Sequence, residues 1–138
     1  MKAIRYSGIL FFLFVFISAT IKTSDGRKIP SIEVRTTTGK TFNTANISND
    51  GKPIIISIWE TNCKPCINEL DAIADEYETW QKETGVKLVA VSIDDSKTSS
   101  KVIPLVNGKG WEYEVYLDIN QDLKRAMKCA EEAVKGGI

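Results

Sequence analysis

The chain contains the stretch WETNCKPC at residues 59–66, and the period of its hydrophobic residues changes across this stretch. Before it, the run IIISIW at 54–59 consists almost wholly of β-branched and aromatic residues, which predicts a strand buried on both faces. After it, apolar residues recur every three or four positions from Ile67 to Trp80 and Gly85 follows, which predicts a helix. The two cysteines therefore lie between a strand and the first turn of a helix.

The rest of the chain predicts further strands and helices in alternation. The patterns predict a hairpin over 31–43, a strand over 87–93, a short helix over 102–106, a strand over 113–117 and a helix that begins at Asn120. Strands that alternate with helices favour an α/β fold whose sheet has parallel crossovers.

Composition limits the chemistry open to this chain. Its 138 residues, 43% of them hydrophobic, suit one domain with one core. The 18 Lys and Arg residues balance 18 Asp and Glu residues, so no basic field would attract a phosphate backbone and we expect no nucleic-acid partner. The lack of histidine excludes a His-based zinc site, a Cys-His pair and a Ser-His-Asp triad. Catalysis would have to use thiols and carboxylates.

The first 19 residues have the pattern of a secretory signal peptide. Lys2 and Arg5 precede an unbroken apolar run over 9–17, and small residues end the segment. The run is about half of the ~20 apolar residues that a spanning helix needs, so we expect cleavage after Ala19, with an uncleaved anchor as the alternative. We therefore expect an exported protein, periplasmic or otherwise extracytoplasmic, with one domain over 25–138 in a compartment that permits disulfides.

Cys63 and Cys66 form a Cys-x-x-Cys motif at the predicted start of the helix. A thiolate there faces free backbone N–H groups and the positive end of the helix dipole, which lowers the pKa of the Cys63 thiol from about 8.5 toward roughly 3.5 to 7.5. Lys64 adds a nearby cation, and Pro65, expected at the first helical position, costs no hydrogen bond. We predict that Cys63 attacks a partner's disulfide and that Cys66 resolves the mixed disulfide.

A structural disulfide and a metal site are the alternatives for this motif. A disulfide that closes so short a loop constrains the unfolded chain little and adds little stability. A thiolate metal site normally takes a second pair of ligands, and only Cys129 remains, which we expect to be half-buried on the last helix. Asp94 and Asp95 are expected to form a solvated helix cap. We therefore favour redox chemistry and predict neither a metal site nor a cofactor.

The motif and its surroundings resemble the extracytoplasmic thioredoxin-like proteins of the TlpA and ResA type. The resemblance runs from about Pro30 to Met127 and is carried by a strand, the pattern Trp-x-x-x-Cys-x-Pro-Cys and a helix with Glu69-Leu70, behind a signal peptide. It implies a thioredoxin-like α/β fold with an N-terminal hairpin, and thiol-disulfide oxidoreductase activity on the thiols and disulfides of partner proteins. It also implies a membrane-linked donor of reducing equivalents.

The same resemblance implies roles for single residues. Cys63 matches the family's nucleophile, Cys66 its resolving cysteine and Pro65 its motif proline. Trp59 matches the aromatic residue that shields the site. Glu69 matches an acid that would move protons to or from Cys66, although a carboxylate in the first helical turn also suits the helix dipole.

Three features depart from the family pattern. Ser57 stands where many thioredoxins bury an Asp, and Asn62 replaces a second aromatic residue. The family's proline opposite the cysteines has no counterpart, because Pro104 is the last proline and the family's final strands do not follow. We therefore expect a C-terminally truncated domain with weakened activity. A noncatalytic binding module and a thiolate metal-binding module are the alternatives, and a peroxidase is less favoured because Thr61 lies two rather than three residues before Cys63.

Overall fold

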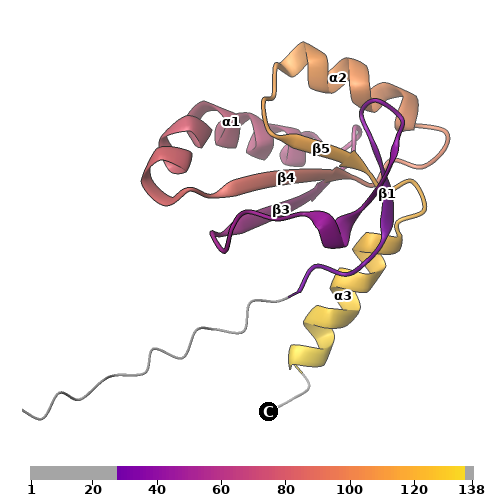
Figure 1. Cartoon of the computed structure of the whole chain (residues 1–138). Coiled ribbons are helices and arrows are strands. Elements are labelled where there is room, and N and C mark those ends of the chain that lie inside the picture. The colour runs from indigo at the N-terminus through magenta and orange to yellow at the C-terminus, as the bar shows by residue number, and fades with distance from the viewer. Residues whose placement is uncertain (1–27, 136–138) are drawn as a thin grey trace, which may run out of the picture.

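The computed structural model of the protein describes residues 28–135. The predicted signal peptide at 1–19 and both ends of the predicted domain, 25–27 and 136–138, lie outside the described residues. The described chain forms a five-stranded sheet of order β2-β1-β5-β4-β3 with helices on both faces (Figure 1). The strands are β1 (Glu33–Thr36), β2 (Thr41–Asn43), β3 (Ile54–Trp59), β4 (Lys87–Ser92) and β5 (Glu114–Leu117). The helices are α1 (Lys64–Thr84), α2 (Val102–Lys109) and α3 (Asp122–Lys135), with short 3-10 turns η1 (Thr44–Asn46) and η2 (Ser99–Lys101).

Strands β3, β4 and β5 form the parallel part of the sheet. Helix α1 connects β3 to β4, and α2 connects β4 to β5. Strand β1 pairs antiparallel with both β2 and β5, and the turn between β1 and β2 contains Gly39 at a φ of +79°, a conformation that glycine adopts without strain. The predicted α/β fold with parallel crossovers and an N-terminal hairpin is therefore confirmed.

Strands β3 and β4 have similar apolar sequences but different surroundings. Strand β4 is paired on both sides, and its residues are buried from Leu88 to Ser92. Among the described strands, β3 pairs with β4 alone; most of its residues are half-buried, and Ile55 is 39% exposed. The prediction that 54–59 is buried on both faces is wrong, because a run of β-branched residues indicates a strand without indicating its place in the sheet.

Helices α1 and α2 both end at a glycine in the left-handed conformation. Gly85 closes α1 at a φ of +67°, and its N–H donates to the Gln81 carbonyl oxygen at 2.9 Å. Helix α2 extends beyond the predicted 102–106, and Pro104 lies in its first turn, where an N–H would have no intrahelical acceptor. No helix between residues 28 and 135 is both long enough and apolar enough to span a membrane.

Helix α3 has a cap that the sequence pattern did not indicate. Asp118 is buried, and its carboxylate accepts hydrogen bonds from the N–H groups of Asp122 at 2.9 Å and Lys124 at 3.0 Å. Two N–H groups that the first helical turn leaves without an acceptor are thereby satisfied. The helix therefore begins at Asp122, two residues after the predicted start at Asn120.

Two hydrophobic cores lie on opposite faces of the sheet, one against α1 and α2 and the other against α3 (Figure 1). Successive residues of β4 point to alternate faces, so Leu88 and Ala90 join the first core while Val89 and Val91 join the second. Leu123 of α3 packs in the second core. Strand β4 thus contributes side chains to the cores beneath both layers of helices.

Four aromatic side chains form a connected row within the first core. Their ring centroids are separated by 5.2, 5.5 and 5.8 Å in the order Trp59, Trp111, Tyr113 and Tyr77. These four residues are called the aromatic row below. Trp111 and Tyr113 are both buried, so the prediction that they are packing residues is confirmed.

Hydrogen bonds tie the polar atoms of three members of the aromatic row, Tyr77, Trp111 and Tyr113, to α1 and β4. Trp111 Nε1 donates to Asp71 at 3.0 Å, and the Tyr113 hydroxyl donates to the Leu70 carbonyl oxygen at 3.3 Å. The Tyr77 hydroxyl accepts from the Leu88 N–H at 3.0 Å. The row therefore fixes α1 on the sheet through directed contacts as well as through buried area.

Candidate active site

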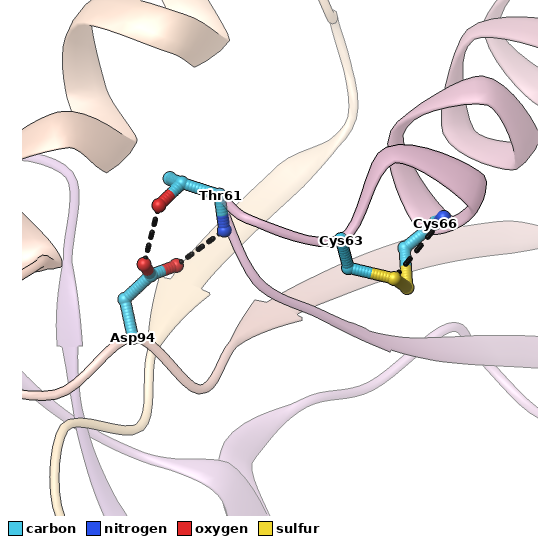
Figure 2. The surroundings of a disulfide bond; sticks show 4 residues. All are labelled: Thr61, Cys63, Cys66 and Asp94. Atoms are coloured by element: carbon cyan, nitrogen blue, oxygen red, sulfur yellow. Dashed lines mark hydrogen bonds between the residues drawn. A yellow bond between two sulfur atoms is a disulfide. The ribbon is translucent and has the colours of Figure 1, made fainter.

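Cys63 lies at the N-terminal end of α1 and is joined to Cys66 by a disulfide (Figure 2). The two Cα atoms are 5.3 Å apart, and both side chains are half-buried. Cys63 is the N-cap residue: its Sγ accepts from the Cys66 N–H at 3.3 Å, and its carbonyl oxygen accepts from the Ile67 N–H at 3.1 Å. The sulfur thus occupies the place where a capping side chain satisfies a free N–H group.

The two sulfurs of the disulfide have different surroundings. In the reduced pair, the Cys66 N–H and the N-terminal end of a 21-residue helix favour a negative charge on the Cys63 sulfur. Cys66 lies one turn further along α1 and packs against the core that contains the aromatic row. The geometry therefore stabilises negative charge on the Cys63 sulfur, whereas the Cys66 sulfur lies beside the hydrophobic core.

The other predicted site residues of α1 lie around its first turns. Lys64 is the first residue of the helix and Pro65 the second, one position later than predicted, and both are exposed. At either position a proline removes no intrahelical hydrogen bond. Glu69 is exposed one turn after Cys66, and none of the hydrogen bonds or ion pairs of residues 28–135 includes its carboxylate.

Trp59 ends β3 and begins the aromatic row. It is 1% exposed and belongs to the core against which Cys66 packs. Its ring meets that of Trp111 edge to face. Its Nε1 is buried and has no hydrogen-bond partner among the described residues. The aromatic row therefore reaches from the middle of α1 to the end of β3, the strand that precedes the disulfide in the chain.

Residues 60–66, called the redox loop below, comprise the link that follows β3 and the first three residues of α1. A turn within the loop is closed by the Cys63 N–H, which donates to the Glu60 carbonyl oxygen at 3.0 Å. Thr61 lies inside this turn and makes two hydrogen bonds to Asp94, one from its N–H at 2.9 Å and one from its hydroxyl at 2.6 Å (Figure 2). The loop is therefore fastened to the end of β4.

Asp94 is buried, and the prediction that it belongs to a solvated helix cap is wrong. Burial alone would raise the pKa of its carboxyl, but the hydrogen bonds from Thr61 and Ser92 outweigh burial and hold the pKa below the usual 3.8. Asp95, by contrast, is exposed and accepts from the N–H groups of Lys97 and Thr98, as expected of a cap. Two adjacent acids therefore have different roles.

The sequence does contain a signal for the contact between Asp94 and the redox loop. Asp94 follows one predicted strand and the redox loop follows another, and the carboxyl ends of neighbouring parallel strands lie at the same edge of a sheet. The contact can be inferred only if β3 and β4 are known to be neighbours in the sheet. Their register then brings the two strand ends together, because Trp59 lies opposite Ser92.

A model of the AhpC/TSA family matches residues 26–138. The chain belongs to the AhpC/TSA family. Among curated proteins, this AhpC/TSA protein is similar to thiol-disulfide oxidoreductase ResA of Bacillus subtilis, 29% identical over 100 residues, and to thiol:disulfide interchange protein DsbE of Yersinia pestis, 30% identical over 90 residues. These alignments cover 72% and 64% of this chain but 53% and 44% of the relatives, so the chain spans about half of their length.

Solved structures agree with this placement. A thioredoxin-like protein from Porphyromonas gingivalis is 54% identical, with a TM-score of 0.64 over 72% of this chain and 65% of that one. StoA of Bacillus subtilis is 22% identical, with a TM-score of 0.55 over 72% of each chain. The AhpC/TSA protein therefore has a thioredoxin-like fold, as the resemblance of its motif implied.

Two further expectations concern cysteine and metal chemistry. Cys129 of α3 is exposed, so the prediction that it is half-buried is wrong. Helical position alone left it at the margin of the apolar face, where burial depends on what packs nearby. Within residues 28–135, no three His, Cys, Asp or Glu side chains of this AhpC/TSA protein come together as metal ligands.

Proposed function

We propose that the protein is a thiol-disulfide oxidoreductase that exchanges disulfides with partner proteins through Cys63 and Cys66. The observation that carries this proposal is the position of Cys63 as the N-cap of α1, where its Sγ accepts from the Cys66 N–H. A sulfur held there is a stable thiolate and a good leaving group. The names of the curated relatives support the same activity.

The exchange proceeds through a mixed disulfide. The Cys63 thiolate attacks one sulfur of the partner's disulfide, and the partner's other sulfur leaves as a thiolate that takes up a proton. Cys66, having lost its proton, then attacks the Cys63 sulfur and releases the second partner thiol. Two electrons pass from the dithiol to the partner, and the reverse sequence oxidises a partner dithiol.

Neighbouring residues would support these steps. Lys64 adds positive charge beside Cys63, and Pro65 holds the start of the helix. Glu69 would exchange a proton with Cys66, and its exposed carboxylate is open to water for this purpose. Trp59 would shield the disulfide on the side of the core, where Cys66 packs.

The cellular setting proposed for this chemistry is extracytoplasmic. The pattern of residues 1–19 supports export, and an oxidising compartment would keep Cys63 and Cys66 in exchange with partner disulfides. A membrane-linked donor would return electrons to the pair. The balance of charges argues against nucleic acid as a partner.

Reduction of insulin by the purified protein, followed by turbidity with dithiothreitol as electron donor, tests the proposal. Wild-type protein should accelerate reduction, and Cys63→Ser should give only the background rate. In a separate reaction without dithiothreitol, pre-reduced Cys66→Ser should accumulate a mixed disulfide with insulin, visible on a non-reducing gel. These variants are best made with Cys129→Ser, because Cys129 is a free, exposed thiol that would compete in disulfide formation. A wild-type rate equal to that of Cys63→Ser would contradict the proposal.

A further inference from the structure

The carboxylate of Asp94 is anchored on Ser92, the last residue of β4, and is directed at the redox loop. It accepts from the Ser92 hydroxyl at 2.8 Å, and the Asp94 N–H donates to the same hydroxyl oxygen at 3.1 Å. Ser92 is fully buried and lies in register with Trp59 of β3 and Leu117 of β5. Asp94 is therefore held in a fixed position by a buried residue of the sheet.

The other hydrogen bonds of this carboxylate go to a single residue of the redox loop. Oδ2 accepts from the Thr61 N–H and Oδ1 from the Thr61 hydroxyl, so both oxygens of the carboxylate hold the same residue (Figure 2). Thr61 lies two residues before Cys63, within the turn that the Cys63 N–H closes. The position of Cys63 thus depends on a contact between residues 33 apart in the sequence.

We propose that Asp94 is a positioning residue which, through Thr61, holds Cys63 where it re-forms the disulfide with Cys66. This inference rests on the proposed function, because it concerns the equilibrium between the dithiol and the disulfide. In the oxidised protein the covalent bond itself restrains the redox loop. In the reduced protein the restraint comes from hydrogen bonds, and Asp94 supplies two of those that hold Thr61.

The restraint shifts the equilibrium between dithiol and disulfide in one direction. If the reduced loop is already ordered, closing the disulfide costs less conformational entropy, so the contact favours the oxidised pair. Loss of the contact frees the reduced loop and shifts the equilibrium toward the dithiol. A contact with a merely structural role would stabilise the oxidised and reduced proteins equally and would leave this equilibrium unchanged.

Equilibration with glutathione measures the effect. One oxidised glutathione takes two electrons and two protons from the dithiol, giving the protein disulfide and two reduced glutathiones, and the two protein forms are quantified after acid quenching and alkylation. All variants carry Cys129→Ser. We expect Thr61→Val and Asp94→Asn each to lower the equilibrium constant for disulfide formation three- to tenfold, where tenfold corresponds to about 30 mV.

Three comparisons distinguish an effect on the position of Cys63 from an effect of charge and from a general effect on folding. Thr61→Val removes the hydroxyl but keeps the Asp94 charge, so a change in Asp94→Asn without a change in Thr61→Val would overturn the proposal in favour of a charge effect. Thr61→Ser keeps the hydroxyl and should restore the wild-type constant. Asp95→Asn removes the adjacent exposed charge and retains a side chain that caps the same turn, so it should leave the constant unchanged.

Urea unfolding of both redox forms gives an independent readout. The oxidised Thr61→Val protein should lose more stability than the reduced one, by the amount that the glutathione constant requires. Equal losses in the two forms would overturn the proposal, and Thr61→Val provides this test even if Asp94→Asn does not fold. Wild-type protein that fails to exchange with glutathione would overturn the proposed function and this inference together, whereas normal exchange with unchanged constants would overturn this inference alone.

Discussion

The redox loop and the aromatic row meet at Trp59 but are held in place by different forces. In the loop, Asn62, Lys64 and Pro65 are exposed, and the turn depends on hydrogen bonds to Asp94 and within the loop. In the row, the rings are mostly buried and packed against one another. Buried area stabilises without fixing direction, whereas hydrogen bonds fix geometry with little net stability.

This difference implies that chemistry and stability are separable in this protein. Substitutions in the redox loop should change disulfide exchange and leave the unfolding of the reduced protein nearly unchanged, while substitutions in the aromatic row should do the opposite. The two regions meet at Trp59, which ends β3 immediately before the loop and begins the row.

The largest effect is expected at the nucleophile. Cys63→Ser should reduce disulfide exchange to background, a loss of at least about a thousandfold, because serine forms no disulfide. Serine is a good N-cap, so the free energy of unfolding of the reduced protein should change by less than about 0.5 kcal/mol. Insulin reduction and urea unfolding measure the two quantities. A large loss of stability in Cys63→Ser would break the separation between the two regions.

In the aromatic row, Trp111→Ala should destabilise the fold by about 3–5 kcal/mol, because it removes a buried ring and leaves a cavity. Urea unfolding of the reduced protein measures the loss. Ile103 of α2, which is 37% exposed, provides the control, since Ile103→Ala should cost far less. The fraction of Trp111→Ala that remains folded should still exchange disulfides, and a folded but inactive variant would show that the row acts on the chemistry.

A smaller effect is expected from one hydroxyl of the row. Tyr77→Phe leaves the buried N–H of Leu88 without its acceptor and should cost about 1–3 kcal/mol. Tyr116→Phe is the matched control, because its hydroxyl bonds to the Glu114 carboxylate, which is partly exposed to water. Equal losses of unfolding free energy in the two variants would contradict the importance of the buried N–H.

The smallest effect concerns acid stability at Asp71, which holds the row through Trp111. The hydrogen bond from Lys109 is the main reason that the pKa of Asp71 lies below 3.8, and burial opposes it only in part. A lowered pKa in the folded state means that the stabilisation is present above about pH 4 and is lost as the pH falls through the folded pKa.

Because both partners of this ion pair are more than a third exposed, the expected contribution is only a few tenths of a kcal/mol. Asp71→Asn should therefore flatten the decline of stability slightly below pH 4, as measured by urea unfolding between pH 2 and pH 6. A steeper decline in the variant would give the wrong sign and contradict this reading of the pair.

Local patterns in the sequence predicted most of the elements and the position of the disulfide. The change of period at residues 59–66 placed Cys63 at the start of α1, and Gly85 marked its end. The same patterns missed the cap at Asp118 and the exposure of Cys129, because each depends on how α3 is seated rather than on its own periodicity.

Two apolar runs and two adjacent acids have surroundings in the fold that the local sequence does not determine. Runs 54–59 and 87–92 are both apolar, yet the first is a half-buried edge strand of the described sheet and the second is a buried strand paired on both sides. Asp94 and Asp95 are adjacent, yet one holds the redox loop and the other caps a turn in water. In both cases the difference depends on contacts with residues from a distant part of the chain, the neighbouring strands for β4 and Thr61 for Asp94.

The sequence by itself determined the reactive pair, its place at a helix N-terminus and the alternation of strands and helices, since all three follow from spacing and periodicity within a few residues. The tertiary structure alone decided which strand lies at the edge and which carboxylate reaches Thr61. The physical reason is that parallel pairing brings together the ends of strands separated by a whole helix, so the contact that positions Cys63 exists only once β3 and β4 lie side by side.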